Sequence, residues 1–107
     1  MSVARLKTEI RVAAHIRRAT AAGAFATIAR KGDVDAGAIA VKVYCGDGKA
    51  RLLMQAYDGE GKEIWREPFE GLADEKEVDA RLEKEARFDS DLWVVEIEDR
   101  EGRAFLD

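Results

Sequence analysis

The chain has 107 residues, of which 37% are charged and 47% hydrophobic, and its formal net charge is −4. This composition is typical of a globular domain with a charged surface, and the length allows one core, so we expect a single domain over residues 1–107. One cysteine excludes an internal disulfide. No apolar run approaches the roughly 18 residues of a membrane-spanning helix, so we expect a cytoplasmic protein without membrane contact.

Charge is unevenly distributed along the chain. Residues 1–31 carry seven Lys or Arg and one acidic residue, a formal +6. The other 76 residues carry eleven Lys or Arg and twenty-one acidic residues, a formal −10. A basic front and an acidic back indicate either a charged partner or pairing of the two parts within the fold.

A helix is predicted over residues 8–22, because Thr8 is a typical N-cap residue and Gly23 a typical stop signal. One face of this helix is apolar and is expected to meet the core: Leu6, Ile10, Ala13, Ile16 and Thr20. The opposite face carries what we name the basic stripe: Lys7, Arg11, His15 and Arg18.

Four strands are predicted next, at residues 24–30, 38–45, 51–57 and 62–67. Short turns rich in Gly and Asp separate them, which predicts an antiparallel meander. Asp74 and Glu77 form a capping box that begins a second helix. A strongly alternating strand follows at 92–98, and a short last strand is expected at 104–106.

These elements predict an α+β fold in the order α-β-β-β-β-α-β. We expect a mostly antiparallel sheet of four to five strands, with both helices on one face and a more polar opposite face. Whether the strand at 92–98 inserts between other strands or pairs at an edge stays open.

The sequence shows no catalytic, cofactor or metal signature. With one His and one Cys, a Cys/His zinc site is impossible within one chain. Cys45 falls on the apolar face of a predicted strand, which is typical of a buried structural thiol. The glycine pairs at 46–48 and 59–61 open no helix, so they are turns rather than phosphate loops. We expect no cofactor, and the sequence favours a non-enzymatic protein without deciding the question.

Two acidic pairs are the remaining candidate for chemistry: Asp89 with Asp91, and Glu96 with Glu98. Glu96 and Glu98 are two apart on a strand, hence on one face and about 7 Å apart. That spacing suits a hard metal ion or acid–base work. It equally describes the solvent face of an amphipathic strand, which is far commoner.

The basic stripe is the strongest functional candidate. It covers about three helical turns, roughly 16 Å, enough to meet two or three phosphates of a nucleic acid. It has no interleaved aromatic residues and no recognisable helix-turn-helix partner. The alternative is a solvated face, or a face that pairs with the acidic second helix.

Several segments together resemble one family over nearly the whole chain. They are Arg30–Asp33, Ala36–Ala38, Val41–Val43, Glu77–Ala80 and the run Arg87–Arg100 with its Leu92-Trp93 pair. They resemble the small alphaproteobacterial proteins numbered fourteen-ninety-one among the domains of unknown function. The resemblance implies a short, single-domain, cytoplasmic bacterial protein, and it brings no activity, cofactor or site residue.

The leading hypothesis is a non-enzymatic interaction module, with a homodimer as one form of it. Aromatic residues and open sheet edges favour such contacts: Tyr44, Tyr57 and Trp65. A second hypothesis is a nucleic-acid accessory protein that uses the basic stripe. A third is an enzyme or metal protein built on Asp89, Asp91, Glu96 and Glu98.

Overall fold

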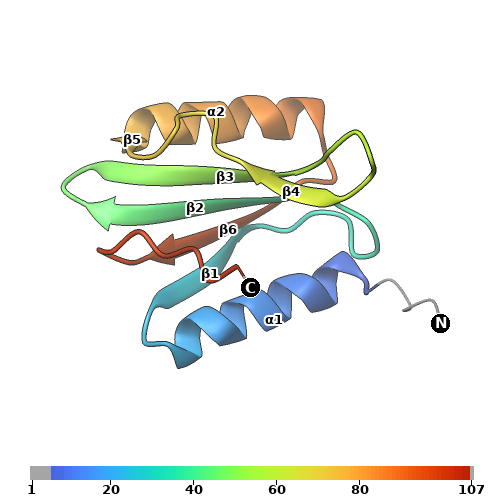
Figure 1. Ribbon diagram of the computed structural model, residues 1–107, viewed down its shortest axis with the longest axis horizontal. Helices are drawn as coiled ribbons and strands as arrows, with labels where there is room; N and C mark the ends of the chain where they lie inside the picture. The colour runs from blue at the N-terminus through green and yellow to red at the C-terminus, as the bar shows by residue number, and fades with distance from the viewer. Residues whose placement is uncertain (1–5, 107) are drawn as a thin grey trace.

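The computed structural model describes residues 6–106 and has two helices and one mixed sheet (Figure 1). The elements in chain order are α1 (Thr8–Ala21), β1 (Phe25–Arg30), β2 (Ile39–Gly46), β3 (Lys49–Tyr57), β4 (Glu63–Arg66), β5 (Ala73–Asp74), α2 (Glu75–Phe88) and β6 (Trp93–Glu98). The expected α+β class and element order are confirmed. Arg5, which counts toward the basic front, lies outside the described residues.

The last strand in sequence lies inside the sheet. The strand order is β1-β6-β2-β3-β4, and the two-residue β5 pairs with β3. β6 is parallel to β2 and antiparallel to β1. The expected meander therefore holds for β2, β3 and β4 but is wrong for β1, which β6 separates from β2. β6 takes the inner position because its Trp93, Val95 and Ile97 are fully buried there, whereas β1 is mostly exposed.

The two helices lie on opposite faces of the sheet, so the expectation of one shared face is wrong. Val12 and Ala19 of α1 pack with Ile39, Val41 and Val43. On the other face, α2 packs through Val78 and Leu82 against Ala40 and Leu52. Successive side chains of a strand point to opposite faces. β2 is buried on both faces, so each face needs a cover.

α1 also turns a different face to the sheet than its apolar pattern predicts. Its buried residues are Thr8, Val12, His15 and Ala19. Leu6 and Ile10, expected in the core, are at least half exposed. Thr8 is the first helical residue rather than the N-cap, and its hydroxyl donates to the Gly37 carbonyl oxygen at 3.0 Å. A distant partner thus decides the orientation of the helix.

The segment after β6 forms no strand at 104–106, contrary to expectation. It crosses the face that α1 covers, where Phe105 and Leu106 pack against the core. Arg51 donates to the Gly102 carbonyl oxygen, and Arg103 lies over the Phe105 ring, 5.1 Å from its centre. Side chains that donate to the backbone therefore hold this segment in place of a strand ladder.

Candidate interaction surface

The structure ties the basic stripe to the rest of the fold. Arg11 Nη2 donates to both carboxylate oxygens of Glu63 on β4, at 2.7 and 3.0 Å. Gln55 on β3 donates to the same carboxylate at 2.5 Å. Lys7, at the start of α1, is exposed and lies 3.6 Å from the carboxylate of Asp35.

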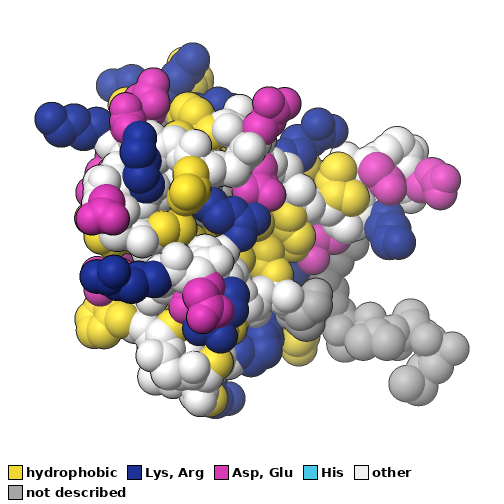
Figure 2. Space-filling model, turned by 60° about the vertical axis from the view of Figure 1, so that its left-hand side comes forward, with side chains coloured by type: hydrophobic (Ala, Val, Ile, Leu, Met, Phe, Trp, Pro, Cys, Tyr) yellow, Lys and Arg dark blue, Asp and Glu magenta, His cyan; other side chains and the backbone are white. Residues whose placement is uncertain are grey.

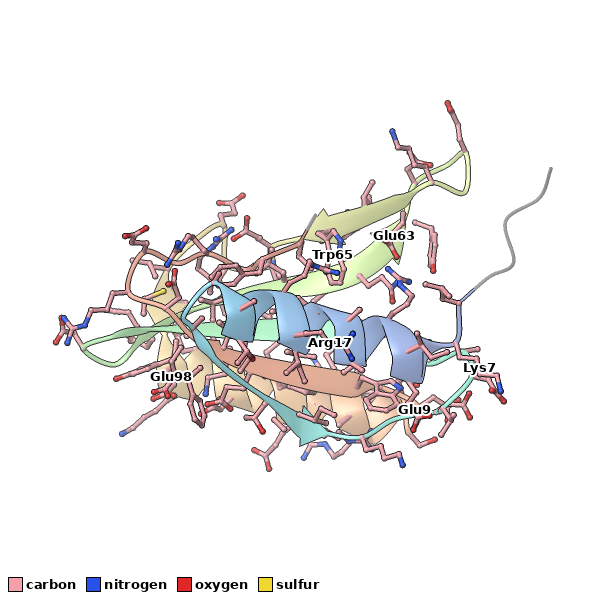
Figure 3. The ribbon with its side chains drawn as sticks, turned by 90° about the horizontal axis from the view of Figure 1, so that it is seen from below. Lys7, Glu9, Arg17, Glu63, Trp65 and Glu98 are labelled. Atoms are coloured by element: carbon pink, nitrogen blue, oxygen red, sulfur yellow. The ribbon has the colours of Figure 1, made fainter. Side chains whose placement is uncertain are left out.

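The other half of the stripe meets the C-terminal segment. His15 is only 4% exposed, and its Nε2 lies 2.7 Å from the carbonyl oxygen of Ala104, which makes it the donor. Arg18 Nε donates to the Phe105 carbonyl oxygen at 3.3 Å. The four residues do lie along one side of α1, as expected. Arg11 contacts β4, and His15 and Arg18 contact the C-terminal segment. Figure 3 shows Glu63 and Trp65 of β4 beside α1.

Surface charge on one face of the molecule is mixed rather than basic. Figure 2 shows Lys and Arg side chains alternating with Asp and Glu, with hydrophobic side chains between them. A nucleic-acid footprint is normally a patch or stripe of one sign. This face offers no such patch.

The four carboxylates of the third hypothesis lie in two separate places. Asp89 is the C-cap residue of α2, and its carboxylate accepts from the Asp91 N–H at 3.0 Å. Glu96 and Glu98 lie in the second half of β6, about 10 and 17 Å along the strand from its first residue, Trp93. Within residues 6–106, no group of three or more His, Cys, Asp or Glu is placed to hold a metal ion.

The thiol of Cys45 is half-buried against the α1-side core. Burial raises the pKa of this thiol above its ordinary value, and the nearby Arg51 only partly offsets that effect. A raised pKa keeps the thiol protonated, so it is not an activated nucleophile. This outcome agrees with the structural role expected from the sequence.

The edge of the sheet at β1 is open. Among the described residues, β1 pairs with β6 alone, so its outer row of N–H and C=O groups has no ladder partner. Phe25 is 65% exposed and Ile28 44% exposed along this edge. Most natural edge strands carry Lys, Pro or inward charges that discourage pairing. β1 reads Phe-Ala-Thr-Ile-Ala-Arg, with a charge only at its last position.

The opposite edge is protected by its sequence. β4 has only four residues and ends with Arg66, two positions before Pro68. Short length, a charge and a nearby proline are the usual means of blocking edge pairing. The β1 edge can therefore pair with a further strand, whereas the β4 edge is protected against such pairing.

A shallow groove adjoins the β1 edge on the α2 face. It has a volume of about 330 Å³. Apolar residues of α2, β1 and β6 form its floor: Ala29, Leu82, Ala86 and Val94. Charged side chains also line it: Arg30, Lys42, Asp79, Glu83 and Glu96. The floor and the edge together make one surface, which we name the β1 edge surface.

Lys42 is a buried charge that the sequence reasoning did not single out. Its Nζ donates to Glu75 at 2.8 Å and to Asp79 at 2.7 Å, and both partners belong to α2. Burial lowers the pKa of Lys42, but the two hydrogen bonds and the nearby Glu96 outweigh it, so the pKa is raised. Two features of the sequence could have indicated this ion-pair cluster. Lys42 interrupts the apolar run of β2, and the acidic residues Glu75 and Asp79 are four apart on α2, hence on one face of that helix. The ion pairs lock α2 over β2 beside the groove.

The family described as "Protein of unknown function (DUF1491)" matches residues 6–107. The chain belongs to this family. No curated protein matches the chain.

Solved structures of the DUF1491 family have the same fold. A crystal structure of a DUF1491 protein from Caulobacter crescentus CB15 is 53% identical, with 95% of each chain covered and a TM-score of 0.87. An NMR structure of a DUF1491 family protein from the same organism is 54% identical, with 94% of this chain and 92% of that one covered and a TM-score of 0.84. The solution structure of Atu0922 from A. tumefaciens is 42% identical, with 88% and 86% covered and a TM-score of 0.73.

Membership in the DUF1491 family confirms the resemblance drawn from the sequence, and the family has no established function. Neither helix of the described residues is long and apolar enough to cross a membrane.

Proposed function

We propose that this DUF1491 protein is a non-enzymatic interaction module of the bacterial cytoplasm, whose partner adds a strand to the β1 edge surface. The observation that carries the proposal is the open, mostly apolar edge of β1. Adding a strand satisfies the free backbone groups, and the side chains on alternate positions supply the specificity.

The neighbouring groove supports the same proposal. A strand paired to β1 covers the exposed part of Phe25 or Ile28 and extends the sheet beneath the flank of α2. Leu82 and Ala86 offer apolar contacts there, and the charged residues that line the groove can select the partner's side chains.

A nucleic-acid role has weaker support. Arg11, His15 and Arg18 all make contacts within the fold, and a nucleic acid would have to displace them or use the charge that remains. A catalytic role for the acidic residues has the weakest support, because Asp89 and Asp91 lie in the turn between α2 and β6, whereas Glu96 and Glu98 lie in the second half of β6.

The test compares edge variants in a pull-down from native lysate. Thr27→Lys places a charge in the middle of β1, and Ala80→Lys places the same charge on the exposed side of α2. We expect a discrete protein partner that survives nuclease, is lost with Thr27→Lys and is kept with Ala80→Lys. A partner retained by both variants would overturn the proposal. Nucleic acid recovered with the wild type, or a partner lost on nuclease treatment, would move the function to the basic stripe.

A further inference from the structure

We propose that the strand received by β1 is the β1 of a second copy, paired antiparallel about a two-fold axis near Thr27. This inference rests on the proposed function and names the partner of the same surface. A two-fold interface needs a patch that complements itself, and β1 meets that requirement in charge and in shape.

Charge along the β1 edge has opposite sign at the two ends. Arg30 ends the strand and Lys31 follows it. At the other end, Phe25 lies opposite the exposed Glu98 of β6. Antiparallel self-pairing brings the basic end of one copy to the acidic end of the other, twice over. Parallel pairing would place like charges together, which is destabilising.

The side-chain sizes along β1 also suit pairing with an antiparallel second copy. In a two-fold antiparallel pair, one residue faces its own copy. With Thr27 at that position, Phe25 faces Ala29 on the α2 side of the sheet. Ala26 then faces Ile28 on the α1 side. Each large exposed side chain meets a small one on both faces, which is the cross-strand packing that stabilises sheets.

Pairing of the two β1 strands centred on Ile28 instead of Thr27 is less favourable. With Ile28 facing its own copy, Ala26 would meet Arg30, and Phe25 would meet Lys31. Arg30 and Lys31 would then lie among the apolar residues of the pair. The irregular register of β1 against β6 falls at Ala29, between Ile28 and Arg30. Phe25–Ile28 is regular, so the irregularity touches only the outer Phe25–Ala29 pairs and spares the central Thr27 and Ala26–Ile28 pairs.

Closure favours a second copy over other partners. An apolar strand edge left open is an aggregation hazard, because any extended chain can add to it. The two-fold pair covers the open β1 edges of both copies. The outer edges of the joined sheet are then the two copies of β4, which are short and charged. The paired molecule thus has no open apolar edge among its described strands.

The first measurement is the molar mass in solution by light scattering over a dilution series. We expect a dimer in the wild type and in Ala80→Lys, and a monomer in Thr27→Lys. Far-UV circular dichroism of each variant checks that it is folded. A wild-type monomer at the highest soluble concentration, or a dimer that persists in folded Thr27→Lys, would overturn the inference.

Cross-linking then tests the register. Opposed residues in antiparallel strands have Cα atoms about 4.5–5.5 Å apart, within the range a disulfide spans. Under mild oxidation, Thr27→Cys is expected to form a covalent dimer at least tenfold faster than Ala80→Cys. Wild type measures the background from Cys45, which is half-buried. Equal rates for the two variants would rule out the Thr27-centred pair.

The two proposals can fail separately. A monomeric wild type whose lysate partner is lost with Thr27→Lys keeps the edge function and removes self-pairing. A monomer whose partner is unaffected by Thr27→Lys removes both.

Discussion

Arg11 and Glu63 join the first helix to the last strand of the β2-β3-β4 meander, because Arg11 Nη2 donates to both carboxylate oxygens of Glu63, at 2.7 and 3.0 Å. Gln55 binds the same carboxylate, so a single acidic side chain holds residues from α1 and β3. Both ionic side chains are about one-third exposed. Much of the positive charge that makes the basic stripe conspicuous in the sequence therefore serves the fold.

Replacing Glu63 by Ala is expected to lower the free energy of unfolding by about 1 kcal/mol, since partly exposed ion pairs contribute modestly. Urea denaturation measures the change. Lys7→Ala is the matched control, because the Lys7–Asp35 pair is more exposed and longer. Equal losses in the two variants would contradict the role assigned to the Arg11–Glu63 contact.

Lys42→Met removes the buried ammonium group while keeping the length of the side chain. Breaking a buried pair costs about 3–5 kcal/mol, but Glu75 and Asp79 are 35% and 53% exposed and regain water, so we expect about 2 kcal/mol. Chemical denaturation checks the value. Adding Glu75→Gln and Asp79→Asn should recover part of the loss, and no recovery would show that the methionine itself packs badly.

Gly37 is a position where no side chain fits. A Cβ there would overlap the Asp91 carbonyl oxygen and lie 2.9 Å from Cδ1 of Trp93. Gly37→Ala is expected to lower the free energy of unfolding by about 3 kcal/mol, the upper range for overpacking. Gly59→Ala, where no described atom lies within 4 Å, should change it by less than about 0.5 kcal/mol. A thermal or urea melt of the two variants separates these outcomes.

Stability should fall in acid partly through Asp99. Its carboxylate accepts from Arg103 Nη2 at 2.8 Å and from the Arg103 backbone N–H at 2.7 Å. The Arg103 side chain is the main reason that the pKa of Asp99 lies below its ordinary value. A lowered pKa stabilises the fold above the unfolded-state value, about 3.9, and this contribution is lost as the pH falls through the folded-state value.

Asp99→Asn is therefore expected to be less stable than wild type at neutral pH, with the difference narrowing below about pH 4. Urea midpoints across the pH range measure it, and Glu60→Gln in an exposed turn is the control. A difference that stays constant down to the acid-unfolding pH would show that Asp99 acts through packing alone.

Local signals in the sequence predicted the elements well. The alternation of β2 and β6 and the start of α2 at Asp74 are where expected. The capping box itself does not form, because the Asp74 carboxylate binds Lys49 at 2.5 Å instead. The helix thus begins at the predicted place through a contact that connects residues 25 apart.

Placement in space depended on contacts that local patterns do not contain. The wheel for α1 favoured Leu6 and Ile10 as core residues, yet small residues and His15 face the sheet. His15 does so because Ala104, 89 residues later, supplies its hydrogen-bond partner. The strand order of the sheet also depends on distant contacts, because nothing in the sequence near β1 indicates that its neighbour is β6.

The interior position of β6 constrains when the fold can form. Neither β1 nor β2 has its native neighbour on that side until residues 93–98 have left the ribosome, so the α1-side core cannot close before then. During that interval, the meander of β2, β3 and β4 and the helix α2 are the parts that can assemble. Until then, β1 and the outer edge of β2 lack a partner. The addition of β6 is therefore the step that commits the whole molecule to its native state.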